Sequence, residues 1–397
     1  MESLLFLTHR IPYPPNKGDK IRSFHLLEYL SQHYQIHLAT FIDLADDWQY
    51  CDKVHHYCTT TWFGKLTPSL AKLQSLVGFI NGQPLSLPYY YRPALARWIK
   101  QTCKTYTIQR VLVYSSVMAQ YVMKHPHCVV DFVDVDSDKW RQYSATQSWP
   151  MRSIYHREAI RLAQFEQQVA TQCAASIFVS EPEAALFRQQ LNDSETAKRV
   201  YTLCNGVDTA FFAPDTKRMS PFIGQAARIV FTGAMDYWAN IEGVTWFAHH
   251  IFPAVRETHP DAEFIIVGMN PTPEVYRLAE HSGIHVTGAV SDIRPYLQYA
   301  KLVVVPLRIA RGIQNKVLEA MAMARPVVTT PQALEGIPAK VNREVYCAGD
   351  ASTFIRAVRH LLTNENNNIT VQARQFVERE FNWKHSLPTI LSLLESN

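Results

Sequence analysis

The chain has 397 residues, more than one hydrophobic core usually serves, so two domains of roughly 150–200 residues are expected. Its apolar content of 47%, charged content of 19% and net charge of +4 are ordinary for a globular protein. No apolar run approaches the roughly 18 residues that a membrane span needs, and no signal peptide is visible. The seven cysteines include no Cys-x-x-Cys pair, which argues against a disulfide framework and favours a cytoplasmic protein.

In the first half of the chain, short apolar runs alternate with helix-length amphipathic segments. Strands are predicted at residues 3–8, 35–41, 110–114, 128–134 and 175–180, and a helix at about 19–33. This alternation is typical of a parallel α/β sheet. A polar stretch with prolines, residues 213–222, then interrupts the pattern and is interpreted as an interdomain linker.

The same rhythm restarts in the second half, with strands predicted at 228–232, 262–267, 285–287, 302–306 and 326–330. The chain is predicted to end in helices, with a break at Asn382 and Trp383. The predicted fold class is therefore α/β, with two Rossmann-like parallel-sheet domains facing across a cleft. Ligands of such sheets bind outside the carboxyl ends of the strands.

Charge is unevenly distributed in the first half. Residues 51–110 contain eight Lys or Arg and one acid, Asp52. Such a patch suits acidic lipid, a pyrophosphate-bearing acceptor or nucleic acid, or is a solvated basic face. The amphipathic stretch 66–76, bracketed by Lys65 and Lys72, either packs in the core or docks on a membrane surface.

The sharpest chemical signal lies at 308–328, where a loop follows a predicted strand and precedes a helix at about 314–323. The loop carries Arg308, Arg311 and Gly312, and the first helical turn offers unpaired N–H groups and the positive dipole end, around Asn315, to a pyrophosphate. Lys316 adds a point charge, and Glu319 lies on a neighbouring part of the same face, where it can accept ribose hydroxyls. The alternative is a surface ion pair between Lys316 and Glu319.

This segment resembles the donor-binding motif of family 4 glycosyltransferases (group 1), in which Glu-x7-Glu precedes Ala-Met-Ala and a Pro-Val-Val strand. Glu319 matches the second Glu, whose role in that family is to hold the donor ribose, and Arg311 stands where the first Glu would fall. The variant Arg-Gly-Ile-Gln-Asn-Lys-x-Leu-Glu-Ala-Met-Ala resembles a subgroup of sugar transferases associated with bacterial exopolysaccharide export and the PEP-CTERM sorting system.

Other segments resemble the same subgroup. They are the stretch 8–22, with Gly18 on the cleft side, the Asn-Gly-Val-Asp motif at 205–208, and the turn 232–240, which includes Gly233. Many family members have a phosphate-binding Arg and Lys in that turn, whereas this chain has Ala234 and Asn240. Arg308, Arg311 and Lys316 are therefore expected to supply the positive charge.

The resemblance implies the two-domain architecture called GT-B. Residues 1–205 would form the acceptor-side domain and 222–378 the nucleotide-sugar domain, with the last helix, 383–397, packing back on the first. The implied reaction moves a sugar from a nucleoside-diphosphate sugar to a lipid-linked or growing saccharide in exopolysaccharide synthesis. It would proceed with retention and without a metal or other cofactor, in the cytoplasm or on the inner face of the plasma membrane.

Two carboxylates at the end of a first-domain strand are candidates for the reacting centre. In the family this loop faces the reacting sugar, often through a His, and here Asp134 or Asp136 takes that place. A carboxylate there could accept the acceptor's proton or stabilise oxocarbenium-like charge, and with Glu319 these residues form the predicted catalytic set. Helix capping or metal binding are the alternatives for the aspartates. His9 and His25 are further candidates for the cleft, or structural residues.

Arg311 inverts the charge found in related enzymes. The hypothesis is that it clamps the pyrophosphate or recognises a carboxylate on an acidic donor sugar, since a planar guanidinium suits both. An ion pair with a nearby acid is the alternative.

Other functions fit two α/β domains. A sugar-nucleotide epimerase would use the same donor site without an acceptor, and a two-lobed binding protein would need no catalysis. The basic patch favours a transferase, and a binding protein would be expected to carry an export signal. Nicotinamide chemistry is disfavoured because no Gly-x-Gly-x-x-Gly follows either first strand. A nucleic-acid partner would leave Lys316 and Glu319 unused and is not expected.

Overall fold

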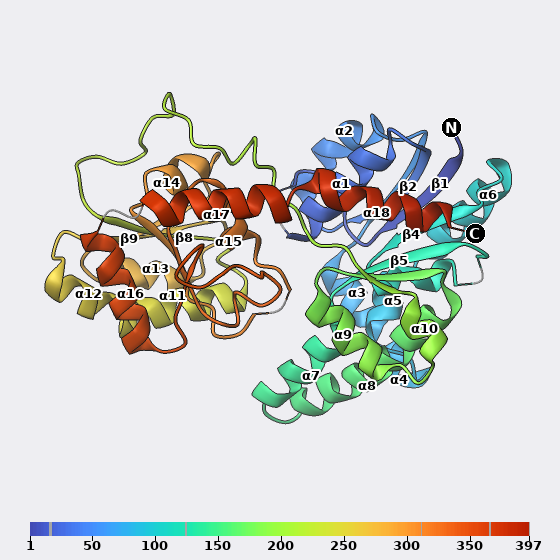
Figure 1. Ribbon diagram of the computed structural model, residues 1–397. Coiled ribbons are helices and arrows are strands. Elements are labelled where there is room, and N and C mark those ends of the chain that lie inside the picture. Colours follow the sequence, from blue (N-terminus) through green and yellow to red (C-terminus); the bar gives the residue numbers. More distant parts are fainter. Residues whose placement is uncertain (16–17, 124, 311, 365–366, 397) are drawn as a thin grey trace. The chain divides into compact units, whose positions relative to one another are not determined.

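The computed structural model describes residues 1–15, 18–123, 125–310, 312–364 and 367–396. The chain divides into two compact units, of which the first combines Met1–Cys204 with Ser386–Asn397 and the second is Asn205–His385. The second unit thus begins upstream of the residue 222 expected from the sequence, and the stretch 213–222 lies inside it. Both units are α/β domains (Figure 1), which confirms the predicted fold class.

The first unit is built on a sheet of seven parallel strands. In spatial order they are β3 (Thr60–Lys65), β2 (Gln35–Ile42), β1 (Ser3–Thr8), β4 (Arg110–Tyr114), β5 (Cys128–Val133), β6 (Ala175–Phe178) and β7 (Val200–Thr202). The central strands are continuous apolar runs because both faces of a parallel sheet are covered. Leu4, Phe6, Leu112 and Val129, for example, are all fully or almost fully buried.

Helices connect these strands. In chain order they are α1 (Gly18–Leu30), the 3-10 helix η1 (Ala45–Tyr50), α2 (Cys51–His55), α3 (Pro68–Ser75), α4 (Val77–Ile80), α5 (Ser86–Tyr90), α6 (Pro93–Thr105), the 3-10 helix η2 (Ser116–Tyr121), α7 (Asp136–Thr146), α8 (Met151–Gln172), α9 (Glu181–Gln190) and α10 (Ser194–Lys198). The last helix of the chain, α18 (Trp383–Glu395), belongs to this unit from Ser386 onward. It is fastened there by Arg110, whose Nε donates to the carbonyl of Leu394 at 2.7 Å.

The second unit has six parallel strands in the order β10 (Ile284–Gly288), β9 (Glu263–Val267), β8 (Arg228–Thr232), β11 (Leu302–Val305), β12 (Val327–Thr329) and β13 (Tyr346–Cys347). Its helices are α11 (Trp238–His250), α12 (Phe252–Thr258), α13 (Pro273–Arg277), the 3-10 helix η3 (Leu278–Glu280), α14 (Arg294–Gln298), α15 (Asn315–Ala322), α16 (Ala351–Thr363) and α17 (Asn367–Glu380). Figure 1 shows α14, α15 and α17 on one face of this sheet and α11, α12 and α16 on the other.

The strand order of each sheet reverses beside its first strand. In the first unit β1 lies between β2 and β4, and in the second β8 lies between β9 and β11. Loops that leave such neighbours diverge to opposite faces, and the gap between them at the carboxyl ends of the strands is where ligands of open α/β sheets bind. The residues that follow β1, β4, β8 and β11 are therefore the ones that the fold positions for function.

No helix within the described ranges combines the length and the apolar composition that a membrane crossing requires.

Candidate active site

In the second unit, the switch point is occupied by a lysine from the first turn of α15. Lys316 extends its Nζ to the Oδ1 atom of Asn240, on α11, at 2.6 Å. The same Nζ lies 4.4 Å from the ring centroid of Phe231, near the end of β8. A cation from the helix that follows β11 thus reaches the carboxyl end of β8.

Gly233, the first residue after β8, makes this approach possible. A Cβ atom at this position would lie 2.9 Å from Lys316 Nζ and 2.8 Å from Asn240 Nδ2. A side chain here would push the ends of Lys316 and Asn240 away, and the φ of 159° is one that residues with a side chain rarely adopt. Asn240 is itself fixed, because its Nδ2 donates to the carbonyl of Ala234 at 2.8 Å.

Lys316 forms no ion pair with any carboxylate of the described residues. Lys316 and Glu319, both among the described residues, form no ion pair with each other. Burial lowers the pKa of Lys316 to about 7, although Glu319 raises it in part. Burial likewise raises the pKa of Glu319 to about 7, with Lys316 acting in the opposite direction. Both side chains would regain their ordinary charge if a ligand supplied the missing partner, an anion for the lysine and hydroxyl donors for the glutamate.

Two more buried atoms at this edge lack partners. The Oγ1 atom of Thr232, the last residue of β8, and the Oε2 atom of Glu242, on α11, are buried without a hydrogen bond. Buried polar atoms are almost always paired, so unpaired ones mark a place that water or a ligand completes.

The other predicted donor-site residues lie in varied positions. Arg308 is turned toward Glu242, with its Nε 2.7 Å from the carboxylate, so its charge is already balanced. Gly312 has a φ of 65°, which glycine adopts freely. Asn315 opens α15 and accepts a 3.4 Å hydrogen bond from Asn205. Gly18 opens α1 in the first unit, and Arg311 lies outside the described residues.

Asn240 and Glu242 belong to this arrangement, although the sequence singled out neither as a contact. Asn240 was assigned only as a replacement for a family lysine, whereas the structure makes it the support of Lys316 Nζ. Their place in the sequence could have indicated this role. Both residues lie on the helix after the first strand of the domain, where proteins of this fold class often contact their ligands.

In the first unit, Asp134 and Asp136 follow β5 and share one cation that sequence reasoning missed. Lys139 Nζ lies 2.7 Å from Asp134 Oδ2 and 3.1 Å from Asp136 Oδ1. Burial lowers the pKa of Lys139, but the two carboxylates raise it well above its usual value. Within the described residues, no three His, Cys, Asp or Glu side chains come together in a way that could hold a metal ion.

Buried carboxylates accept hydrogen bonds from every second residue of the loop that carries the two aspartates. Asp131 accepts from Val133 N at 3.2 Å, Glu183 on α9 from Val135 N at 2.8 Å, and Glu166 on α8 from Ser137 Oγ at 2.5 Å and Ser137 N at 3.3 Å. Val133 has a φ of 71°, which strains a β-branched residue. Strain held in place by several independent contacts is typical of functional loops.

Glu166 gives a direct test of this arrangement. Its side chain is fully buried, and burial and Asp136 raise its pKa to about 8, while Ser137 and Lys139 lower it. Between pH 4.5 and 8 the folded protein therefore keeps a proton that the unfolded chain has released, so stability falls as pH rises through this window. Gln cannot ionise at this position, so the Glu166→Gln variant should melt at the wild-type temperature at pH 5 and at a higher temperature at pH 8. At pH 8 its free energy of unfolding should exceed that of the wild type by roughly 1–3 kcal/mol.

The matched control is Glu158→Gln, on the same helix. Glu158 is also buried and accepts from a Ser hydroxyl and two backbone N–H groups, but at Leu85 and Ser86 of the α5 region. Hydrogen exchange gives a second readout. In the Glu166→Leu variant the backbone amides of residues 137–146 should exchange faster than in the wild type, and in the Glu158→Leu variant they should not. A melting difference at pH 8 no larger than at pH 5 would contradict the role of Glu166.

The second unit matches a known family. Residues 226–364, from β8 to α16, match the family model of glycosyl transferases group 1, and this range contains Lys316 and Glu319. No curated protein is similar enough in sequence to match the chain.

Solved structures resemble the whole chain. HepE of Anabaena, in complex with UDP, is 14% identical, with a TM-score of 0.69 over 100% of both chains. Sucrose-phosphate synthase of Thermosynechococcus elongatus is 13% identical, with a TM-score of 0.72 over 100% of this chain and 98% of the other. WaaG, a glycosyltransferase involved in lipopolysaccharide biosynthesis, is 14% identical, with a TM-score of 0.68 over 99% and 100%. The chain therefore has the GT-B fold, and residues 226–364 of its second unit match the model of the glycosyl transferases group 1.

Proposed function

We propose that this protein is a glycosyltransferase that moves a sugar from a nucleoside-diphosphate sugar to a hydroxyl of an acceptor. The observation that carries the proposal is Lys316, a half-buried cation at the switch point of the second unit that forms no ion pair with a described carboxylate. UDP is the nucleotide in the HepE complex, so we propose UDP or a related nucleoside diphosphate as the carrier.

The second unit would bind the leaving group. The diphosphate would accept hydrogen bonds from Lys316 and from N–H groups at the N-terminal end of α15, and both would stabilise the negative charge that grows as the sugar leaves. Glu319, three residues along the helix, would accept the ribose hydroxyls. Because these groups can balance the diphosphate, we propose that the reaction needs no metal ion.

The first unit would serve the reacting sugar and the acceptor. Asp134 and Asp136, one on each side of Lys139, would stabilise positive charge at the anomeric carbon or take the acceptor's proton. We propose, on the resemblance of the motif 311–322 to sugar transferases of exopolysaccharide and PEP-CTERM systems, that the acceptor is a lipid-linked or growing saccharide. Retention of configuration and a cytoplasmic location are part of the same proposal.

A surface of the first unit supports contact with an anionic membrane. Helices α3 and α4, with the residue that joins them, expose six large apolar side chains: Leu70, Leu73, Leu76, Val77, Phe79 and Ile80. The membrane interpretation of the stretch 66–76 thus fits better than full core packing, although Leu66 and Ala71 are buried. No acidic residue occurs between Asp52 and Asp131 in the sequence.

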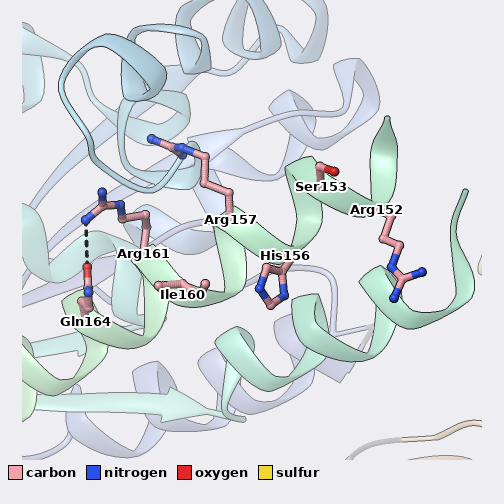
Figure 2. Close-up of a pocket in the computed structure, with 7 residues that line it drawn as sticks. All are labelled: Arg152, Ser153, His156, Arg157, Ile160, Arg161 and Gln164. Atoms are coloured by element: carbon pink, nitrogen blue, oxygen red, sulfur yellow. Dashed lines mark hydrogen bonds between the residues drawn. The ribbon is translucent and has the colours of Figure 1, made fainter. Parts of the chain in front are cut away.

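The neighbouring face of α8 is basic. Figure 2 shows that Arg152, His156, Arg157 and Arg161 of this helix line one pocket. The guanidinium of Arg157 lies 4.7 Å from the ring centroid of Phe79 and donates to the carbonyl of Gly78 at 2.7 Å, so the basic and apolar surfaces adjoin. Apolar side chains beside arginines are the pattern by which surfaces bind anionic lipid.

The nucleotide site can be tested by calorimetry with UDP and UDP-glucose. Lys316→Met should abolish measurable binding because it removes the charge that faces the diphosphate. Glu319→Gln should weaken binding roughly ten- to a hundredfold, the cost of one charge-assisted hydrogen bond. Lys301→Met, the same exchange at an exposed position of the second unit, should bind like wild type, and EDTA should change nothing. If none of a range of nucleoside diphosphates binds the wild-type protein, the proposed function is wrong.

Membrane contact can be tested with sedimenting vesicles of phosphatidylcholine and phosphatidylglycerol. Leu70 and Leu73 are 66% and 69% exposed, so replacing both with Ser should leave the fold intact. The double variant should bind these vesicles at least about tenfold more weakly, because each leucine contributes roughly 1.5–3 kcal/mol when buried in lipid. Val371→Ser, on an exposed apolar residue of the second unit, should have no effect. Equal binding by the double variant would rule out this surface.

A further inference from the structure

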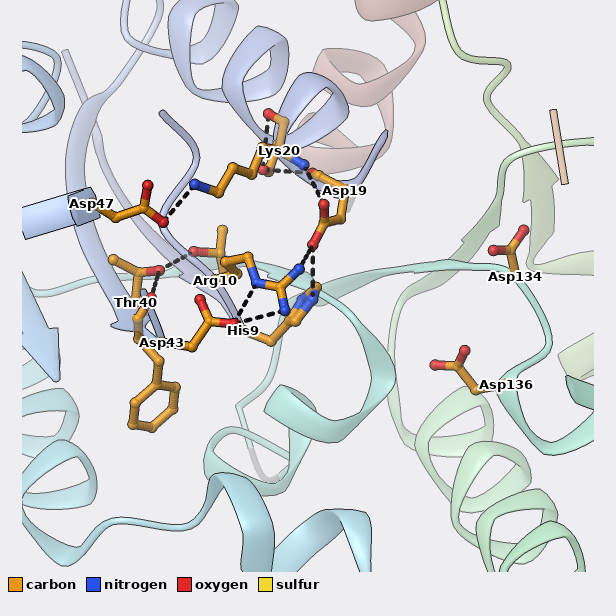
Figure 3. A network of polar contacts seen from close by, with 12 residues as sticks. His9, Arg10, Asp19, Lys20, Thr40, Asp43, Asp47, Asp134 and Asp136 are labelled. Atoms are coloured by element: carbon orange, nitrogen blue, oxygen red, sulfur yellow. Dashed lines mark hydrogen bonds and ion pairs between the residues drawn. The ribbon is translucent and has the colours of Figure 1, made fainter. Parts of the chain in front are cut away.

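The carboxyl edge of the first sheet carries a second set of polar side chains, around its switch point. They come from the ends of four strands that are neighbours in the sheet: His9 and Arg10 after β1, Asp43 after β2, Tyr114 and Ser116 at and after β4, and Asp134 and Asp136 after β5. Figure 3 shows this edge, with the carboxylate of Asp136 pointing toward the side of His9 and Arg10.

Arg10 is held between two carboxylates. Its Nη1 lies 2.6 Å from Asp19 Oδ2, and its Nη2 and Nε lie 2.8 Å and 3.1 Å from Asp43 Oδ2. Burial lowers the pKa of Arg10, but Asp19 and Asp43 raise it above its usual value. The side chains of Arg10 and Asp19 remain 29% and 26% exposed, so they are fixed in place yet reachable by a ligand.

The pKa values of two tyrosines respond to charges from this network and also to charges from the aspartates after β5. Burial raises the pKa of Tyr90, Arg10 lowers it, and Asp43 and Asp136 raise it further. Burial also raises the pKa of Tyr114, with Asp19 and Asp134 among the charges that add to the effect. Each phenol therefore lies within electrostatic reach of one carboxylate from the network and one from the β5 loop. The His9 ring stacks on Tyr114 at 5.8 Å and meets Tyr90 edge-on at 5.9 Å.

The polar atoms of this edge are incompletely paired. Tyr114 and Ser116 are each 1% exposed, and neither hydroxyl has a hydrogen-bond partner. His9 Nδ1, Asp43 Oδ1 and Asp134 Oδ1 are also buried without partners. So many unpaired polar atoms at one sheet edge indicate a binding site. A ligand with both hydrogen-bond donors and acceptors, or the water that such a ligand displaces, would supply the missing hydrogen bonds.

The charge balance limits what that ligand can be. Arg10 and Lys139 face four carboxylates, those of Asp19, Asp43, Asp134 and Asp136, which leaves two negative charges in excess. Arg10 and Lys139 are both paired with these carboxylates, so a phosphate or uronate would meet repulsion from the described part of this edge. Hydroxyl groups suit these side chains, because a carboxylate accepts a hydrogen bond from a hydroxyl and a guanidinium donates one to it.

We propose that this edge of the first unit binds an uncharged sugar through its hydroxyl groups. Asp43 and Asp136 would accept hydrogen bonds from these hydroxyls and Arg10 would donate hydrogen bonds to them, while the ring of Tyr90 would pack against the apolar face of the sugar. This rests on the proposed function and deepens it by naming the substrate class. The sugar that enters is an uncharged saccharide unit, not a sugar phosphate or a uronic acid. Either the acceptor end or the transferable sugar of the donor could supply it.

The test is saturation-transfer NMR on the full chain, with the methyl glycosides of glucose, galactose, mannose and N-acetylglucosamine, and with glucuronate, galacturonate and glucose 1-phosphate. At least one neutral glycoside should bind at millimolar concentration, and the anionic sugars should bind more weakly. Asp43→Asn should weaken that binding by about tenfold, the cost of one hydrogen bond to a charged group. Asp46→Asn makes the same exchange at an exposed residue three positions on and should bind like wild type.

Asp136→Asn is the second variant, because its side chain is 30% exposed and its replacement leaves the Arg10 network untouched. Binding in the presence of saturating UDP identifies the acceptor as the source of the sugar. Displacement by UDP-glucose but not by UDP identifies the donor sugar. Tighter binding of the anionic sugars, no neutral glycoside bound, or no loss in either variant would overturn the proposal. Glycoside binding by a protein that binds no nucleotide would instead refute the transferase function and leave the sugar site standing.

Discussion

One buried ion pair holds the first unit's functional edge together. Arg22, on α1, and Asp131, on β5, are both completely buried, and two hydrogen bonds of 2.7 and 3.1 Å join them. The same guanidinium donates to the carbonyl of Leu203 at 2.7 Å. Such a pair contributes little net stability, but removing one partner leaves a buried charge that costs about 3–5 kcal/mol. Because Arg22 follows the loop of His9 and Arg10, and Asp131 precedes Asp134, the pair sets the geometry on which both sets of side chains depend.

The two switch points carry opposite chemistry. In the second unit a lysine lies in the first turn of a helix, whose N-terminal end carries positive partial charge, and this combination suits a diphosphate. In the first unit carboxylates outnumber cations and aromatic rings line the edge, which suits hydroxyls. A reaction that releases a nucleoside diphosphate and joins a sugar to a hydroxyl needs both environments. The same fold thus places each kind of group where its parallel strands end.

The sequence predicted much of the fold, because central parallel strands such as 128–133 are continuous apolar runs between helix-length segments. It missed β3, β7 and β13: β3 is polar and aromatic, and the other two have three and two residues, too few to show a period. Candidate residues were harder to place, since a contact depends on which strands are neighbours. The sequence pointed to Lys316 and Asp134, but not to the bond from Lys316 to Asn240, the pairing of Arg308 with Glu242, or the bridge from Lys139. Glu166 had a signal, a carboxylate among the apolar positions Leu162, Phe165 and Val169 of one helix.

The central claim, transfer of a sugar from a nucleotide donor, is tested most directly by the fate of the donor. The protein would be incubated with a mixture of nucleotide sugars and lipid-linked saccharides, and the products would be followed by mass spectrometry. The account predicts that one nucleotide sugar is consumed, with equal amounts of nucleoside diphosphate and of a saccharide one sugar unit heavier. Conversion of the donor to an isomer of the same mass, or no consumption of any donor by a folded protein, would contradict it.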